Sequence, residues 1–192
     1  KEDAGCDIYG KQRLELAIYL KNNILPHIKN DWFIENGTLL GAWRNGKFIK
    51  HDDDFDIGIL LNSKEDINHL YSTINNKLLN SKYKARLIDT YSSKIEIFDE
   101  SYGKYILIAD KYNSSDFHYV TLDLQFYIKN ENGCYEKLYY ISPVNKIFNK
   151  DILLPTGTIK LENETFNAPN NIELFLKQIY GSIDMNASYN SK

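Results

Sequence analysis

The feature that most restricts the folds open to this chain is a run of aspartates at 52–56 that leads directly into an apolar strand pattern ending at Leu61. Side chains of a strand alternate between its two faces, so we expect Asp52, Asp54 and Asp56 on one face and Asp53 on the other. Like charges held this close repel one another unless a cation neutralises them, and Mg²⁺ takes oxygen ligands of this kind. The run therefore indicates a metal site, with a solvated acidic loop or a calcium-binding turn as the alternatives.

A turn and a short helix are expected just upstream, at 37–44. Backbone N–H groups at a helix N-terminus bind anions, so Gly37 and Thr38 are candidates for holding a phosphate across the pocket from the metal. A plain helix cap is the alternative. Arg44 and Lys47 follow as candidates for neutralising phosphate charge, with a surface role as the alternative, more so for Lys47.

A third candidate element is the strand pattern from Thr121 to Phe126. Its leucines and Phe126 are expected to face the core, which puts Asp123 on the opposite face. Aspartate is unfavourable in such a strongly strand-forming run, so Asp123 invites a functional explanation. An edge strand with one wet face is the alternative.

The remaining patterns predict an α+β fold, a mixed and mostly antiparallel sheet with packed helices. Helices are expected over 11–29 with a kink or boundary at Pro26, over 64–79 with Ser63 as cap, and from Ile172 onward. Strands are expected over 32–34, 55–61, 85–88, 95–98, 105–109, 119–128, 135–141 and as a pair around 159–166. No linker or composition break is visible, so we expect one domain over 1–192, with a core at about 11–181.

Composition limits the partners. The net charge of −3 leaves no excess of Lys and Arg to neutralise a nucleic acid, so no nucleic-acid partner is expected. No run approaches the roughly 18 apolar residues of a membrane span, although a chain that begins at a lysine is compatible with an upstream anchor. Cys6 and Cys134 are too few for a zinc signature, and His27, His69 and His118 have no ligand spacing.

Residues 37–57, which read GTLLGAWRNGKFIKHDDDFDI, resemble the signature of the LicD, fukutin and fukutin-related protein family. The likeness extends to Asp123 and to the C-terminal segment 169–181, which ends in Tyr-Gly. This resemblance implies a nucleotidyltransferase-like fold. It also implies Mg²⁺-dependent transfer, with Mn²⁺ as a possible substitute, of phosphocholine, ribitol phosphate or a similar phospho-alcohol from a CDP-linked donor to a sugar hydroxyl of a glycan.

On this resemblance, Asp54 and Asp56 hold the metal on the donor pyrophosphate. Asp123 is a third ligand or the base that accepts the proton of the acceptor hydroxyl, and Asp52 joins the metal or supports its ligands. Gly37 and Thr38 hold a phosphate oxygen.

The chain departs from the family pattern at Lys50 and His51, where proline and tryptophan are common, and it lacks the zinc-binding cysteines of the fukutin-related branch. Two other functions stay open: nucleotidyl transfer from a nucleoside triphosphate, and a catalytically silent protein that binds glycan or acts as a scaffold. The compartment also stays open, because bacterial relatives act in the cytoplasm and animal ones in the Golgi lumen.

Overall fold

The molecule is built around a seven-stranded sheet. The computed structural model describes residues 6–50, 52–88, 93–102, 105–106, 116–138 and 146–181. Five strands lie side by side in the order β1 (Trp32–Ile34), β2 (Asp56–Leu61), β7 (Thr121–Lys129), β4 (Lys94–Asp99) and β3 (Tyr83–Ile88). β8 (Tyr135–Lys137) pairs with β7, and β9 (Ile147–Phe148) pairs with β8. Among the described pairs of this sheet β2–β7 is parallel and the others are antiparallel, so the predicted α+β class is confirmed.

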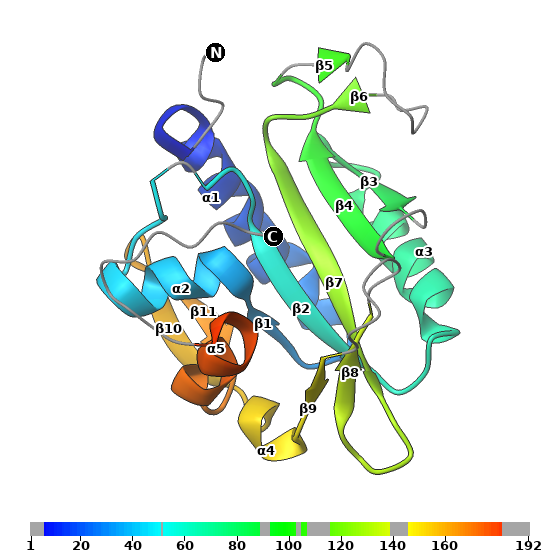
Figure 1. The fold of residues 1–192 in the computed structure, drawn as a ribbon. Helices are drawn as coiled ribbons and strands as arrows, with labels where there is room; N and C mark the ends of the chain where they lie inside the picture. Colours follow the sequence, from blue (N-terminus) through cyan, green and yellow to red (C-terminus); the bar gives the residue numbers. More distant parts are fainter. Residues whose placement is uncertain are drawn as a thin grey trace.

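Helices lie on both sides of this sheet (Figure 1). On the far side in that view are α1 (Cys6–Asn23), the short 3₁₀ helix η1 (Leu25–His27) and α3 (Asp66–Leu78). Around β1 lie α2 (Asn36–Asn45), α4 (Lys150–Leu153), α5 (Ile172–Tyr180) and the hairpin of β10 (Gly157–Leu161) and β11 (Glu164–Ala168). A small pair, β5 (Tyr105–Ile106) and β6 (Asp116–Phe117), stands at the end of the sheet where β7 begins.

One part of the hydrophobic core lies between the sheet and the helices α1 and α3, and another part, with Phe33, Tyr127, Phe148 and Phe175 in ring contact, packs on the opposite face. Helix α3 buries a stripe at helical spacing, Ile67, Leu70, Ile74 and Leu78. The three central strands turn alternate residues toward this side: Ile57, Ile59 and Leu61 from β2, Leu122, Leu124 and Phe126 from β7, and Ile95 and Ile97 from β4. Burial of each such side chain stabilises the fold by about 1.5–3 kcal/mol.

Most predicted elements are present, with shifted ends. The helix predicted to continue to residue 29 ends at Asn23, and the Pro26 region forms the separate turn η1. The helix predicted from residue 64 begins at Asp66, and its N-cap is Glu65 without a side-chain capping bond, so the prediction of Ser63 as cap is wrong. The Asp66 carboxylate instead accepts a hydrogen bond from the Ser63 N–H. Helix α4 and the strands β6 and β9 were not predicted, and they are only two to four residues long. The predicted strand ends at 107–109 and 139–141 lie outside the described residues.

Within the described residues no helix is long and apolar enough to cross a membrane. Cys134 is a free thiol.

Candidate active site

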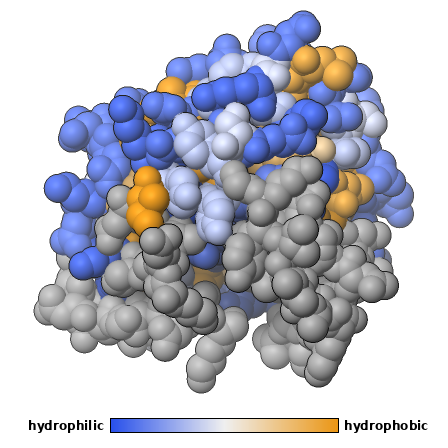
Figure 2. All heavy atoms as spheres, turned by 90° about the horizontal axis from the view of Figure 1, so that it is seen from above, coloured by the Kyte–Doolittle hydropathy of each residue, from blue (hydrophilic) through white to orange (hydrophobic). Residues whose placement is uncertain are grey.

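Two aspartates stand next to each other where β2 and β7 begin. Asp56 is the register partner of Asp123 in this parallel pair, and the Asp123 N–H donates to the Phe55 carbonyl at 2.9 Å. The expectation that these strands lie side by side is therefore confirmed. The edge-strand alternative for Asp123 is wrong, because β7 has β2 on one side and β4 on the other. Figure 2 views this end of the molecule, and the described residues there are mainly hydrophilic.

The three preceding aspartates do not follow strand geometry. Strand β2 begins only at Asp56, and the Asp54 N–H donates to Asp52 Oδ1 at 3.2 Å in a turn. Asp52, Asp53 and Asp54 each offer a carboxylate oxygen within 4.8 Å of the other two. The expectation that Asp53 points away from its neighbours is therefore wrong, because no sheet pairing imposes alternation on this segment.

Two glycines explain how the aspartates reach the start of α2. Gly37 and Gly41 are four residues apart on the helix and share one of its faces. A Cβ added to Gly41 would lie 2.4 Å from the Lys47 carbonyl oxygen, and one added to Gly37 would lie 2.6 Å from Asp52 Oδ2. The chain after α2 therefore returns along this glycine face and delivers Asp52 to the helix N-terminus.

Thr38 connects the start of helix α2 to Asp56 at the start of β2. Its side-chain Oγ1 accepts a hydrogen bond from the Asp56 N–H at 3.0 Å, and both residues are buried. Gly37 and Thr38 thus lie directly next to the aspartates, and the phosphate-binding role expected of them stays a prediction. Their backbone N–H groups belong to the first turn of α2, where a helix favours negative charge.

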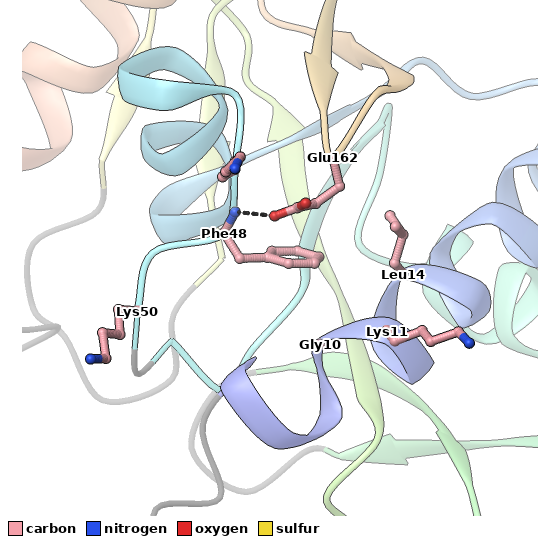
Figure 3. A pocket seen from close by; sticks show the side chains of 7 residues that line it. Gly10, Lys11, Leu14, Phe48, Lys50 and Glu162 are labelled. Atoms are coloured by element: carbon pink, nitrogen blue, oxygen red, sulfur yellow. Dashed lines mark hydrogen bonds between the residues drawn. The ribbon is translucent and has the colours of Figure 1, made fainter.

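Arg44 and Lys47 are placed differently. Arg44 lies in the last turn of the ten-residue helix, roughly 12 Å along its axis from the first turn, and Lys47 follows it. Lys47 lines a cavity of about 480 Å³ together with Gly10, Lys11, Leu14, Phe48, Lys50 and Glu162. In Figure 3 the Phe48 N–H donates to Glu162 at 3.0 Å, while Lys11 and Lys50 point away from each other. The structure therefore separates these two cations from Gly37 and Thr38.

The clustered carboxylates raise one another's pKa. Desolvation, followed by the charges of Asp123, Asp53 and Asp52, raises the pKa of Asp54 to about 7. Burial, followed by Asp123, Asp54 and Glu35, raises the pKa of Asp56 well above its usual range. Burial also raises the pKa of Asp52. Each shift means that the protein alone does not neutralise these charges.

Sequence reasoning missed a lysine at the site. Lys94 of β4 donates from Nζ to Asp123 Oδ2 at 2.9 Å. Desolvation lowers the pKa of Lys94, but the neighbouring carboxylates, first that of Asp123, outweigh it and leave the pKa above its ordinary value. Asp123 Oδ1 is buried and accepts no hydrogen bond from the described residues. The alternation of Lys94 and Glu96 with two isoleucines was the signal that could have placed both on the face of Asp123.

These residues belong to a polar row that crosses four strands. The sheet register places Asp56 beside Asp123, Asp123 beside Glu96, and Glu96 beside Arg86. Arg86 binds Glu96 Oε1 through Nε at 2.9 Å and Nη2 at 2.8 Å. One end of the row is therefore the Arg86–Glu96 ion pair, and the other end is Asp56 beside Asp123, which Lys94 contacts.

A buried ion pair lies beneath the aspartates and was also missed. Glu35 Oε2 is 3.2 Å from Lys137 Nζ, with both side chains fully buried, and it accepts a hydrogen bond from the Tyr127 hydroxyl. Lys137 also donates to Asn36 Oδ1 at 3.2 Å. The Glu35 N–H donates to the Asp56 carbonyl at 3.0 Å, so this network fixes the start of α2 against β2.

Comparison with known proteins places the chain in a family. The lincosamide antibiotic adenylyltransferase LnuA, solved with lincomycin bound, is similar over 82% of this chain and 78% of that chain, with 17% identity and a TM-score of 0.47. No curated protein matches the sequence significantly. Residues 29–171 match the family described as LicD/FKTN/FKRP, nucleotidyltransferase domain. Because this match covers well over half of the chain, and includes the aspartate run, the turn before it and Asp123, the chain belongs to the LicD/FKTN/FKRP nucleotidyltransferase domain family.

Proposed function

We propose that this protein transfers a phospho-alcohol from a CDP-linked donor to a sugar hydroxyl, using a divalent cation at Asp54, Asp56 and Asp123. Family membership supports a transferase. The observation that carries the site is the register pairing of Asp56 with Asp123, whose buried Oδ1 has no hydrogen-bond donor among the described residues. The CDP-linked donor and the glycan acceptor rest on the resemblance of residues 37–57 to the family signature.

The donor set fits Mg²⁺, or Mn²⁺ in its place. Both ions prefer oxygen ligands, and the three aspartates come from two adjacent strands and the turn before one of them. The raised pKa values of Asp54 and Asp56 indicate unneutralised negative charge, which a cation would remove. Bound there, the ion would offset the charge of the donor diphosphate and of the departing CMP.

The chain's own groups have distinct tasks in this proposal. In the transfer step the acceptor hydroxyl oxygen forms a bond to the phosphorus that carries the alcohol, the bond from that phosphorus to the CMP oxygen breaks, and the hydroxyl proton passes to a base. Asp123 either serves as that base or completes the metal ligands. Asp52 supports the cluster from the turn, and the Gly37 and Thr38 N–H groups donate to a phosphate oxygen. Arg44 and Lys47 remain candidates for contacts at the far end of a long donor.

Two other functions compete with this one. Nucleotidyl transfer from a nucleoside triphosphate would use the same carboxylates, since a metal bridges adjacent phosphates in either ligand. A silent glycan-binding or scaffold protein would keep the fold and have no need of a cation. The turn of Asp52, Asp53 and Asp54 is also compatible with a simple cation-binding loop.

One experiment separates these functions. Thermal unfolding is followed with and without Mg²⁺ in the presence of CDP-choline, CDP-ribitol, CDP-glycerol, CTP or ATP, and the released nucleotide products are identified. We expect one CDP-alcohol to raise the melting temperature only when Mg²⁺ is present, and to be turned over with release of CMP. Tighter binding of CTP or ATP with release of pyrophosphate would replace this proposal with nucleotidyl transfer. Protection by glycan alone, independent of Mg²⁺, would favour the silent protein.

A further inference from the structure

Lys94 lies on the same sheet face as the aspartates and approaches them from β4, whereas α2 is tied to β2. It lies on β4, where its register partner is Gln125, two residues beyond Asp123. Its side chain therefore runs diagonally along the sheet face to reach Asp123 Oδ2 at 2.9 Å. The side chain keeps 23% of its surface exposed, whereas that of Asp123 keeps 9%. Lys94 is thus a partly solvated cation on a buried carboxylate.

Three carboxylates act on the Lys94 ammonium, Asp123 most strongly, then Glu96 and Asp54. Glu96 is already paired with Arg86, so the ammonium mainly compensates Asp123 and Asp54. A lysine ammonium has three donors on a flexible four-carbon stem, and it binds phosphate as a point charge. A divalent cation bound to the Asp123 carboxylate would repel the Lys94 ammonium and displace it from that carboxylate.

The position of Lys94 relative to α2 suggests where the ammonium goes. Asp56 and Asp123 lie in the middle of the strand order, with α2 tied to β2 through Thr38 and with Lys94 on β4. A diphosphate above the two aspartates would therefore have the N–H groups of α2 on one side and Lys94 on the other. Both features favour negative charge.

We propose that Lys94 has two alternating partners: it neutralises Asp123 when no divalent cation is bound, and it binds a phosphate oxygen of the nucleotide donor when a cation takes Asp123. The second half rests on the proposed function, in that it requires a donor with a diphosphate. The first half requires only the cation. In this arrangement Lys94 competes with the cation but assists the nucleotide, so its removal has opposite effects on the two ligands.

The test compares Lys94→Met with the wild-type protein and with Lys84→Met. Lys84 is a matched control on β3, exposed and paired with Glu100 at 3.1 Å. Mn²⁺ affinity is measured by titration calorimetry without nucleotide. We expect Lys94→Met to bind Mn²⁺ about tenfold more tightly, because a nearby positive charge is gone, and both Lys84→Met and the charge-conserving Lys94→Arg to stay within about twofold of wild type. A lysine with only a structural role would not tighten cation binding when removed.

Nucleotide affinity is then measured at saturating Mn²⁺ with CDP-choline and with CTP. We expect Lys94→Met to weaken whichever of them binds by about tenfold, and Lys94→Arg to restore most of that loss. Both nucleotides carry adjacent phosphates. If the phospho-alcohol proposal fails, Lys94→Met should therefore still weaken nucleotide binding, but for CTP instead of CDP-choline. Circular dichroism confirms that each variant is folded, and Lys94→Gln replaces Lys94→Met if the latter is not. Unchanged or weaker Mn²⁺ binding would overturn the first half, and unchanged affinity for both nucleotides would overturn the second.

Discussion

Near the starts of β2 and β7, the two faces of the central sheet carry opposite chemistry. On the face toward α1 and α3, Ile57 and Leu124 are fully buried. On the other face, Asp56 and Asp123 keep only 8% and 7% of their surface exposed. The two faces therefore differ little in burial at these positions. They differ in whether the protein itself supplies ionic or hydrogen-bonding partners for the buried groups.

The charged face has two kinds of charge. Glu96 is paired with Arg86, and Glu35 with Lys137, so these carboxylates have a cation from the same chain. Burial raises the pKa of Glu96 as well, although Arg86 lowers it. For Asp54 and Asp56, burial and then neighbouring carboxylates raise the pKa, and Asp123 has one oxygen without a donor among the described residues. Paired charges are expected to support the fold, and unneutralised ones to support function.

Loss of a metal-site carboxylate should have the largest effect. Asp54→Asn or Asp56→Asn is expected to lower transfer by at least about 100-fold, since even groups that only support metal ligands are worth roughly 10–100-fold. The metal-free protein should be as stable as wild type or more so, because one of several like charges is gone. Activity assays and urea unfolding in EDTA check both parts. Unchanged Mg²⁺ affinity in both variants would place the metal elsewhere.

Loss of the buried Lys137 should lower the stability of the fold. Lys137→Met leaves the Glu35 carboxylate buried without its cation, and we expect a loss of about 3–5 kcal/mol in the free energy of unfolding. The double variant Glu35→Gln with Lys137→Met should lose less than Lys137→Met alone, because no uncompensated charge remains. Urea unfolding measures both. Lys177→Met is the control: its exposed pair with Glu173 should be worth at most about 0.5 kcal/mol. Additive losses in the double variant would contradict the assignment.

A substitution on the apolar face should leave the site intact. Ile59 is fully buried, so Ile59→Ala is expected to cost about 2–5 kcal/mol of stability. Mn²⁺ affinity of the folded variant should stay within about twofold, because Ile59 faces away from the aspartates. Calorimetry below the unfolding transition checks this. A large loss of cation affinity would mean that the two faces are not independent.

The last effect expected is a pH dependence of stability. The pKa of Asp54 is about 7 in the folded protein, above its unfolded value of 3.8, so the folded state binds more protons between these values. The stability that this proton contributes is fully present below about pH 4 and is lost as pH rises through about 7. In EDTA the free energy of unfolding should therefore fall across this window, and Asp54→Asn should flatten that fall. Equal slopes in both proteins would rule out Asp54 as the source.

Elements and residue positions that depend on the local sequence pattern could be predicted, whereas those that depend on tertiary pairing could not. The apolar periodicity of α3 and the alternation in β7 identify their elements, and Asp123 was placed on the correct face from alternation alone. Asp52, Asp53 and Asp54 were misplaced because their geometry depends on where the β2 ladder begins, which no local signal marks. Lys94, Glu35 and Lys137 were missed because their partners are distant in sequence, 92 residues away in the case of Tyr127 with Glu35.

The most direct test of the account is the position of the bound cation. Crystals of the protein soaked with Mn²⁺ would give an anomalous-scattering peak at the ion. We predict a peak within about 2.0–2.6 Å of carboxylate oxygens of both Asp56 and Asp123, with Asp54 as a further ligand. Lys94 Nζ should then lie away from Asp123. A peak that contacts only the turn of Asp52, Asp53 and Asp54, with the Lys94–Asp123 pair intact, would contradict the central claim and leave a simple cation-binding loop.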